Sequence, residues 1–343
     1  MTSRRRMPRW SGPLVTLKRG TISGLAALLV LVGVSGAAAS VTKPEPSPGT
    51  TEFNSSFHQG IVPIDGGYVH YVMGGSGPAL VLLHGWPETW YGWHLVMPAL
   101  AKTHTVIAFD LPGLGDSSIP DGGYDKKTTA ARLHQAVNRL GYTKVEVMGH
   151  DMSVLIGYDW ARDYPSEVTR LAVLESTLLG FGLEDAYPLS FHFGFNMAPY
   201  PIPERILDDE DVGTYLDYVF HFAKVSDAID RDYYVRAYLN PARRSAGYNY
   251  YRAFPADAKD NQAYAQSKRL TQPVLAMGAE FLFGPAVATS FKNVASDVRG
   301  VVAPGSGHWI QEETPQFVID CANLFFGPAG VPAPSPALAN CVA

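Results

Sequence analysis

Short apolar runs alternate with amphipathic stretches along much of this 343-residue chain. The amphipathic stretches cover residues 128–140, 154–164 and 315–325, where apolar side chains recur at helical spacing. The apolar runs are typical of strands buried on both faces, and they cover residues 79–83, 105–109, 145–148, 171–174, 274–277 and 300–302. Strands that alternate with helices predict an α/β fold with a mostly parallel central sheet flanked by helices.

Residues 178–270 interrupt this alternation. The interval is dense in Tyr, Phe, Asp and Arg, and it contains helical patterns but few strand-like runs. We therefore predict a helical cap inserted between a first core segment, residues 53–177, and a second, residues 271–327. Most aromatic side chains of the interval are expected to pack the cap against the core.

The first forty residues differ from the rest of the chain. Basic residues precede an apolar run at about residues 22–34, and small residues follow up to Ser40, which is typical of a secretory signal peptide. The run is short for a membrane span, which needs roughly 20 residues, so an uncleaved anchor is the less favoured alternative. We expect a secreted or periplasmic protein without stable membrane association after residues 1–40 are removed.

Removal of residues 1–40 would take away six basic residues and no acidic ones, so the formal net charge would fall from −5 to −11. This charge argues against a nucleic-acid partner. Residues 41–52 resemble a linker, and residues 328–343 resemble a loose tail rich in Pro and Ala. The only cysteines, Cys321 and Cys341, are too few for a zinc site and could form a disulfide that pins the tail after export.

Residues 145–153 combine a strand, a tight turn and the start of a helix, which is the outline of a nucleophile elbow. Gly149 and Ser153 are small enough to let strand and helix approach closely, which lifts the side chain of Asp151 above the sheet. Asp is also a common helix N-cap, and this is the structural alternative. In an elbow, a carboxylate attacks carbon directly and forms an alkyl ester, a chemistry that suits epoxides and halides.

Two further loops carry candidate groups. His84-Gly85-Trp86-Pro87 follows an apolar strand, so the backbone amide of Trp86 could join that of Met152 in an oxyanion hole. His308 follows the last predicted strand, and its place in the chain favours a general base over a surface histidine.

The general base needs an acidic partner, and two glutamates compete for this role. Glu175 ends the strand that follows the elbow helix, whereas Glu280 lies just past the next strand. We prefer Glu175, because it ends on the strand adjacent to that of the nucleophile. In the predicted cap, His192 and Tyr251 could donate a proton to a leaving oxygen, although composition alone would assign both to packing.

With these residues identified, the chain resembles the epoxide hydrolase and dehalogenase branch of the α/β-hydrolases, and most closely the secreted Cif-type epoxide hydrolases. The resemblance spans about residues 57–326. It is carried by the string Trp90-Tyr91-Gly92-Trp93-His94, by residues 105–115 and by Gly307-His308-Trp309.

The resemblance implies a set of roles. Cif-type enzymes place the acid 24 residues after the nucleophile, as Glu175 follows Asp151, and they open the ring with a histidine and a tyrosine, which His192 and Tyr251 match. Ser153 departs from the glycine that is usual in the family. The resemblance also implies a homodimer and a reaction that uses no metal or organic cofactor.

The resemblance therefore predicts an enzyme that opens a small-molecule epoxide to a vicinal diol. Haloacetate dehalogenases follow the nucleophile with arginine and haloalkane dehalogenases with tryptophan, whereas Met152 stands there in this chain. Haloalkane or haloacid dehalogenation is the first alternative function. A non-catalytic secreted binding protein with a hydrolase fold is the second.

Overall fold

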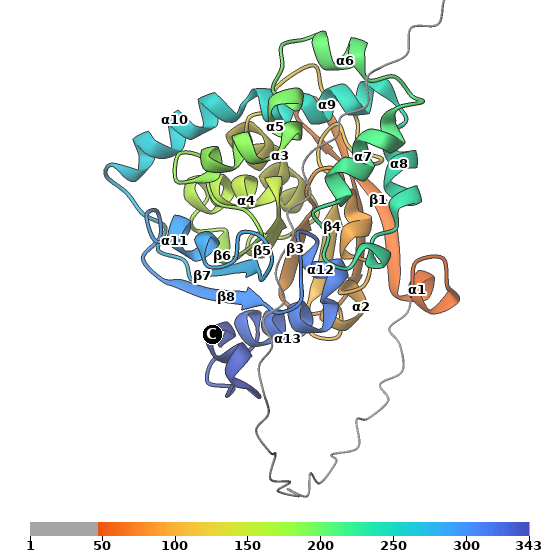
Figure 1. Cartoon of the computed structure of the whole chain (residues 1–343). Helices are drawn as coiled ribbons and strands as arrows, with labels where there is room; N and C mark the ends of the chain where they lie inside the picture. The colour runs from red at the N-terminus through yellow and green to blue at the C-terminus, as the bar shows by residue number, and fades with distance from the viewer. Residues whose placement is uncertain (1–46, 343) are drawn as a thin grey trace, which may run out of the picture. The chain divides into compact units, whose positions relative to one another are not determined.

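The structure, a computed structural model, describes residues 47–342. An eight-stranded sheet runs through this part of the chain in the order β1-β2-β4-β3-β5-β6-β7-β8 (Figure 1). Strand β2 pairs antiparallel with β1 and β4, and all other neighbours are parallel. The strands are β1 (Phe57–Ile64), β2 (Gly67–Gly75), β3 (Ala79–Leu83), β4 (Thr105–Phe109), β5 (Val145–His150), β6 (Val168–Leu174), β7 (Val274–Ala279) and β8 (Val298–Ala303).

This architecture confirms the predicted α/β fold class and the mostly parallel sheet. The predicted strands correspond to β3 to β8. The prediction missed β1 and β2, the antiparallel pair at one edge of the sheet. Many residues of both strands are exposed, and they include polar side chains and glycine, so neither strand forms a continuous apolar run.

The sheet is covered on both faces, which explains why its inner strands are continuously apolar. In β3, Val81 and Leu83 belong to one hydrophobic core, and Leu80 and Leu82 belong to the other, as the two-residue period of a strand requires. Helices α3 (Lys126–Arg139), α4 (Met152–Asp163) and α11 (Ala286–Phe291) contribute to the first core, together with helices that lie between β6 and β7 in the chain. Helices α2 (Met97–Leu100), α12 (Ile310–Glu313) and α13 (Pro315–Phe326) contribute to the second.

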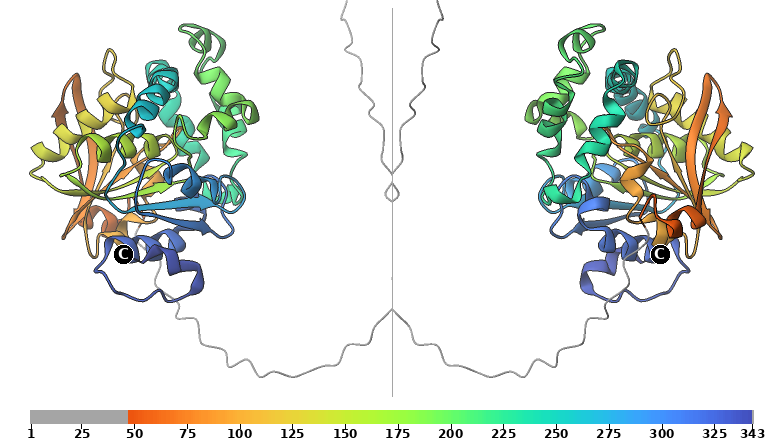
Figure 2. Two further views of the ribbon diagram at one scale, coloured as in Figure 1. Left: turned by 90° about the vertical axis from the view of Figure 1, so that its left-hand side faces the viewer. Right: turned by 90° about the vertical axis from the view of Figure 1, so that its right-hand side faces the viewer.

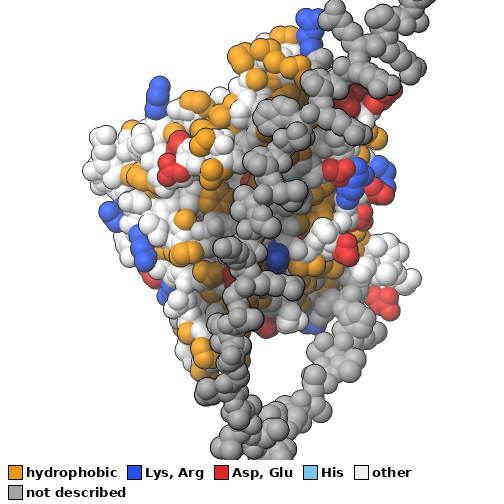
Figure 3. Space-filling model, in the orientation of Figure 1, with side chains coloured by type: hydrophobic (Ala, Val, Ile, Leu, Met, Phe, Trp, Pro, Cys, Tyr) orange, Lys and Arg blue, Asp and Glu red, His pale blue; other side chains and the backbone are white. Residues whose placement is uncertain are grey.

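Every element described between β6 and β7 is helical, in the interval where the sequence predicts the inserted cap. The insertion consists of η2 (Leu183–Leu189), α5 (Phe191–Asn196), α6 (Ile202–Ile206), α7 (Val212–Phe220), η3 (Ser226–Ala228), α8 (Arg231–Tyr238), α9 (Pro241–Arg252) and α10 (Phe254–Ala265). In Figure 1, α6 and α9 lie at the top and α10 at the upper left, whereas α7 and α8 descend on the right toward α12. Figure 2 shows the same helices from two further sides. Exposed apolar side chains, among them Tyr200, Ile202 and Ile206, lie around α6 (Figure 3).

The two ends of the described chain are both packed. Helix α1 (Thr51–Ser56) starts inside the predicted linker and buries Phe53. Cys321 and Cys341 form a disulfide, a pairing that the sequence left open, and it joins α13 to the short helix η4 (Pro336–Cys341). The end of the tail is therefore anchored by the disulfide and by buried Leu338, while most of its other described residues are exposed.

The predicted signal peptide, residues 1–40, lies outside the described residues, as does the first part of the predicted linker. None of the helices in residues 47–342 combines the length and the apolar character that crossing a membrane requires.

Candidate active site

Asp151 occupies the sharp turn between β5 and α4. Its φ of 51° and ψ of −120° lie in a region that L-residues rarely adopt. Gly149 is required at this turn, because a Cβ there would lie 2.5 Å from the carbonyl oxygen of Ser153. Although Asp151 directly precedes α4, its side chain makes no capping hydrogen bond. The helix-cap alternative is therefore wrong, and the turn instead presents the carboxylate to its surroundings.

The Asp151 carboxylate has one partner from each of two loops. The backbone amide of Trp86 donates a hydrogen bond to Oδ1 at 2.9 Å, and Nε2 of His308 lies 3.4 Å from Oδ2. Burial raises the pKa of Asp151, but contact with His308, the charge of His150 and the Trp86 amide outweigh it and lower the pKa to about 2. Asp151 is thus a carboxylate at neutral pH, the form that a nucleophile needs.

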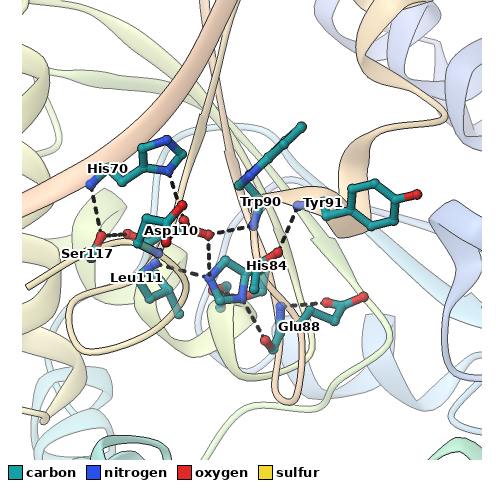
Figure 4. A network of polar contacts seen from close by, with 12 residues as sticks. His70, His84, Glu88, Trp90, Tyr91, Asp110, Leu111 and Ser117 are labelled. Atoms are coloured by element: carbon teal, nitrogen blue, oxygen red, sulfur yellow. Dashed lines mark hydrogen bonds and ion pairs between the residues drawn. The ribbon is translucent and has the colours of Figure 1, made fainter. Parts of the chain in front are cut away.

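The loop after β3 is held by a network of polar contacts (Figure 4). Nε2 of His84 accepts a hydrogen bond from the Leu111 amide at 3.0 Å, and Nδ1 of His84 donates to the Gly85 carbonyl at 2.7 Å. The carboxylate of Glu88 accepts a hydrogen bond from the Gly85 amide at 2.7 Å. These contacts hold the loop in the position from which the Trp86 amide reaches Asp151.

The elbow and this loop approach each other closely. A Cβ at Gly85 would lie 2.5 Å from the Cβ of Asp151, so only glycine fits there. The Ser153 hydroxyl, which replaces the usual glycine, donates to the His84 carbonyl and ties the elbow to the loop. Met152, the second predicted oxyanion donor, is the first residue of α4, where amides lack an intrahelical acceptor. Of the two predicted amides, only that of Trp86 bonds the carboxylate in the described structure.

His308 lies on the loop between β8 and α12, and it is buried rather than exposed on the surface. Its backbone amide donates to the carbonyl of Phe222, which belongs to the insertion, at 3.0 Å. This contact and the approach to Asp151 place the imidazole between the core and the insertion. Nδ1 of His308 is buried and has no hydrogen-bond partner within the described residues.

The two candidate acids lie in different environments. Glu175 is fully buried at the end of β6, and its carboxylate accepts hydrogen bonds from the amides of Ala279 and of Phe283, the latter at 2.9 Å. Burial raises the pKa of Glu175 to about 7, while the charge of His308 opposes this rise. Glu280 is exposed and accepts from the Gly305 amide at 2.7 Å. Burial and the electrostatic interaction with His308 favour Glu175 as the acid.

The structure also reveals a buried ion pair that sequence reasoning missed. Nδ1 of His150 lies 2.9 Å from Oε2 of Glu88, and Nε2 of His150 lies 2.8 Å from the carbonyl oxygen of His308. Gln311 in α12 donates to Oε1 of Glu88 at 2.8 Å. His150 directly precedes the nucleophile, which was the only available signal, and its partners lie far away in the sequence. The pair connects the elbow, the Trp86 loop and the His308 loop.

A cavity of about 190 Å³ lies next to Asp151 and is lined by residues of both the core and the insertion. Its walls are mainly apolar, and its ionisable lining residues are Asp151, His192, Tyr251 and His308, with no Lys or Arg among the lining side chains. Leu189 and Leu282 also line the cavity and are exposed to solvent. These two side chains therefore mark its mouth.

The predicted donors His192 and Tyr251 lie side by side on the ring of Trp86. The His192 ring stacks on Trp86 with centroids 6.0 Å apart, and the Tyr251 ring meets Trp86 edge-on at 5.5 Å. Burial lowers the pKa of His192 to about 4 and raises the pKa of Tyr251 well above its usual range. Both groups are neutral at neutral pH and carry a proton that they can donate in a hydrogen bond.

One group of potential metal ligands within residues 47–342 lies outside the cavity. It comprises His70, Asp110 and Asp116. Nδ1 of His70 and Oδ2 of Asp110 already contact each other at 2.8 Å, and the Asp116 amide donates to that same oxygen at 2.9 Å. The Asp110 carboxylate is therefore already engaged by His70 and by the Asp116 amide, and these contacts stabilise the loop after β4.

Comparison with known proteins agrees with this geometry. Residues 78–315 match the family model of the alpha/beta hydrolase fold. The chain is 38% identical over 276 residues to the soluble epoxide hydrolase of Corynebacterium sp. (strain C12), which covers 77% of this chain and 96% of that protein. The solved structure of epoxide hydrolase CorEH without ligand matches with a TM-score of 0.73 at 35% identity, over 79% of this chain and 98% of that chain.

A fluoroacetate dehalogenase of Burkholderia sp. is 34% identical over 160 residues, which is 44% of this chain and 53% of that protein. The chain belongs to the α/β-hydrolase fold family, in the branch that contains epoxide hydrolases and dehalogenases.

Proposed function

We propose that this protein opens epoxides to vicinal diols through a covalent hydroxyalkyl ester on Asp151. One observation carries the proposal: an ionised carboxylate on the elbow shares an apolar cavity with two neutral proton donors, His192 and Tyr251. A carboxylate can attack a ring carbon, and the oxygen that leaves that carbon needs donors to stabilise its developing charge.

In the first step, an oxygen of Asp151 forms a bond to a ring carbon while the bond between that carbon and the epoxide oxygen breaks. Tyr251 gives its phenolic proton to this oxygen, and His192 donates a hydrogen bond to it. Burial raises the pKa of Tyr251 in the free enzyme, and the charge of Asp151 raises it further. Esterification removes that charge, so the phenolate that remains is less unfavourable after the bond has formed.

In the second step, His308 takes a proton from water, whose oxygen adds to the ester carbonyl of Asp151. The amides of Trp86 and Met152 stabilise the oxyanion, and the charge of Glu175 stabilises the protonated His308. Collapse releases the second hydroxyl of the diol, which takes the proton of His308. The proton on the regenerated Asp151 carboxyl group returns to the Tyr251 oxygen, so every group that the reaction requires is a side chain or a backbone amide.

Carbon–halogen hydrolysis is the second candidate, because it would use the same Asp151 and His308 and because a fluoroacetate dehalogenase is among the relatives. A haloacid substrate needs a cation for its carboxylate, and none of the cavity-lining residues is Lys or Arg. Met152 also lacks the indole N–H that would bind a halide. A non-catalytic binding role is less favoured still, because a binding protein has no use for an ionised, strained Asp151.

The helical insertion acts as a cap in this proposal, because it supplies His192 and Tyr251 and lines the cavity with apolar side chains. The substrate is therefore an uncharged, mainly apolar epoxide. The 24-residue spacing from Asp151 to Glu175 and the His192–Tyr251 pair support membership of the Cif-type subgroup. Export to the periplasm or medium is supported by the pattern of residues 1–40 and by the disulfide. We also propose that the protein forms a homodimer, as the resemblance to the Cif-type enzymes implies.

The variant His308→Gln tests the reaction class, because loss of the base blocks the second step and traps the ester. With apolar terminal epoxides, we expect the intact mass to rise by that of a whole epoxide. The double variant His308→Gln/Asp151→Asn should form no adduct. An adduct from haloalkanes alone, with release of halide, would identify a dehalogenase. No adduct from either panel, with folded protein, would refute both reactions.

A further inference from the structure

Ser190 contacts His192 at the edge of the cavity. Its Oγ lies 2.6 Å from Nδ1 of His192, and both residues line the cavity. Ser190 is buried and directly precedes α5. This short contact occupies Nδ1, so Nε2 is the nitrogen that remains for a bound molecule.

The contact determines which ring nitrogen of His192 carries the proton, because His192 is neutral. Burial lowers the pKa of His192 to about 4, and a neutral imidazole has one N–H donor and one acceptor nitrogen. If Nδ1 accepts a hydrogen bond from Ser190, Nε2 carries the proton. If Nδ1 instead donates to Ser190, Nε2 presents a lone pair that would repel the oxygen of an epoxide.

A chain of hydrogen bonds favours the first arrangement. The Phe191 amide can only donate, and it donates to the hydroxyl oxygen of Tyr218 at 2.8 Å. The Tyr218 hydroxyl lies 3.2 Å from Oγ of Ser190, and because its oxygen already accepts one hydrogen bond, donation of its own proton to Ser190 is favoured. The Ser190 proton is then directed to Nδ1 of His192. A backbone amide that can only donate thus biases the direction of the whole chain.

We propose that Ser190 is a positioning residue that holds His192 as the Nε2–H tautomer, so that this ring donates a hydrogen bond to the oxygen of the bound epoxide. This inference rests on the proposed function and assigns a role to a residue that does not itself touch the reacting atoms. It makes Ser190, with Tyr218 behind it, part of the ring-opening step and not of ester hydrolysis.

The matched variants are Ser190→Ala, which removes the hydroxyl, and Ser190→Thr, which keeps it. The extended backbone of Ser190, with φ −142° and ψ 124°, is one that a β-branched residue readily adopts. Tyr218→Phe removes the donor to Ser190 and leaves the Ser190–His192 contact in place. Thermal unfolding of each variant verifies that it is folded.

Two readouts separate the proposal from a merely structural role. The first is the tautomer of His192, measured from the nitrogen shifts of 15N-histidine-labelled protein without substrate. The second is single-turnover kinetics, with ester formation measured in the His308→Gln background and ester decay measured with His308 present. We expect the Nε2–H form in the wild type, and in Ser190→Ala a mixed tautomer and about 10-fold slower ester formation with unchanged ester decay.

Ser190→Thr should retain the wild-type tautomer and rate, and Tyr218→Phe should shift both in the direction of Ser190→Ala by a smaller amount. An Nδ1–H tautomer in the wild type would overturn the proposal, as would equal slowing of both steps in a folded Ser190→Ala variant. Because the tautomer is measured without substrate, it tests Ser190 directly. A wild-type protein that forms no diol from any epoxide would refute the proposed function instead.

Discussion

Glu88 and His150 form a buried ion pair that connects three loops of the candidate active site. Oε2 of Glu88 lies 2.9 Å from Nδ1 of His150, and both side chains are almost completely inaccessible to solvent. Glu88 also accepts a hydrogen bond from the Gly85 amide, and Nε2 of His150 lies within hydrogen-bond distance of the His308 carbonyl oxygen. The relative positions of the nucleophile, the oxyanion donor and the base therefore depend on one charged contact.

We expect Glu88→Gln to destabilise the protein strongly. The change leaves His150 buried without a counterion, and breaking a buried ion pair from one side typically costs about 3–5 kcal/mol. Urea denaturation of the variant and the wild type measures the difference in free energy of unfolding. Glu280→Gln is the matched control, because this exposed carboxylate accepts one backbone amide and has no buried charge as a partner. Equal losses in the two variants would contradict the role assigned to the pair.

The same ion pair predicts how stability depends on pH. Burial lowers the pKa of His150, but the charge and hydrogen bond of Glu88, together with Asp151 and the His308 carbonyl, raise it to about 9. Because the pKa in the folded state exceeds the usual value of about 6.5, the stabilisation is complete below about pH 6.5 and is lost as the pH rises through about 9. We expect Tm to fall between pH 7 and pH 9.5. Calorimetry measures Tm over this pH range. A Tm that does not change would show that His150 is not charged.

Glu175→Gln should slow hydrolysis of the ester by at least about 100-fold, because the protonated His308 loses its buried negative partner. Ester formation on Asp151 should change much less, since His308 does not act in that step. Rapid-quench mass spectrometry follows both rates. Glu280→Gln again serves as the control and should leave ester hydrolysis nearly unchanged. The reverse order of effects would assign the acid to Glu280.

Replacement of Cys321 and Cys341 by serine should lower stability by about 3 kcal/mol, because the disulfide closes a loop across a sequence separation of 20 residues. Chemical denaturation of the double variant measures this loss, and the wild type treated with a reductant should show the same shift. If the reduced wild type and the variant were as stable as the oxidised protein, packing of Leu338 and its neighbours alone would hold the C-terminal segment.

Much of this protein could be predicted from the order of its residues. The strands from β3 to β7 are largely buried, so each contains a continuous apolar run, and the turn at Asp151 requires small residues at fixed positions around it. Local geometry thus determines the elbow, the parallel sheet and the place of the insertion. The exposed antiparallel pair β1 and β2 was missed, because strands with an open face carry no such run.

Which distant groups meet depends on how the chain folds. Glu88, His150 and Gln311 are spread along the chain, and no spacing predicts that they share hydrogen bonds. The sequence favours Glu175 over Glu280 only by its place on the strand next to the nucleophile and by its spacing, whereas the structure separates them by burial. Ser190 and His192 are close in the sequence, but the desolvation that keeps the His192 ring neutral is imposed by the folded insertion. Sequence specifies which side chains are available, whereas pairing, burial and protonation state arise from the packing that brings separate loops together.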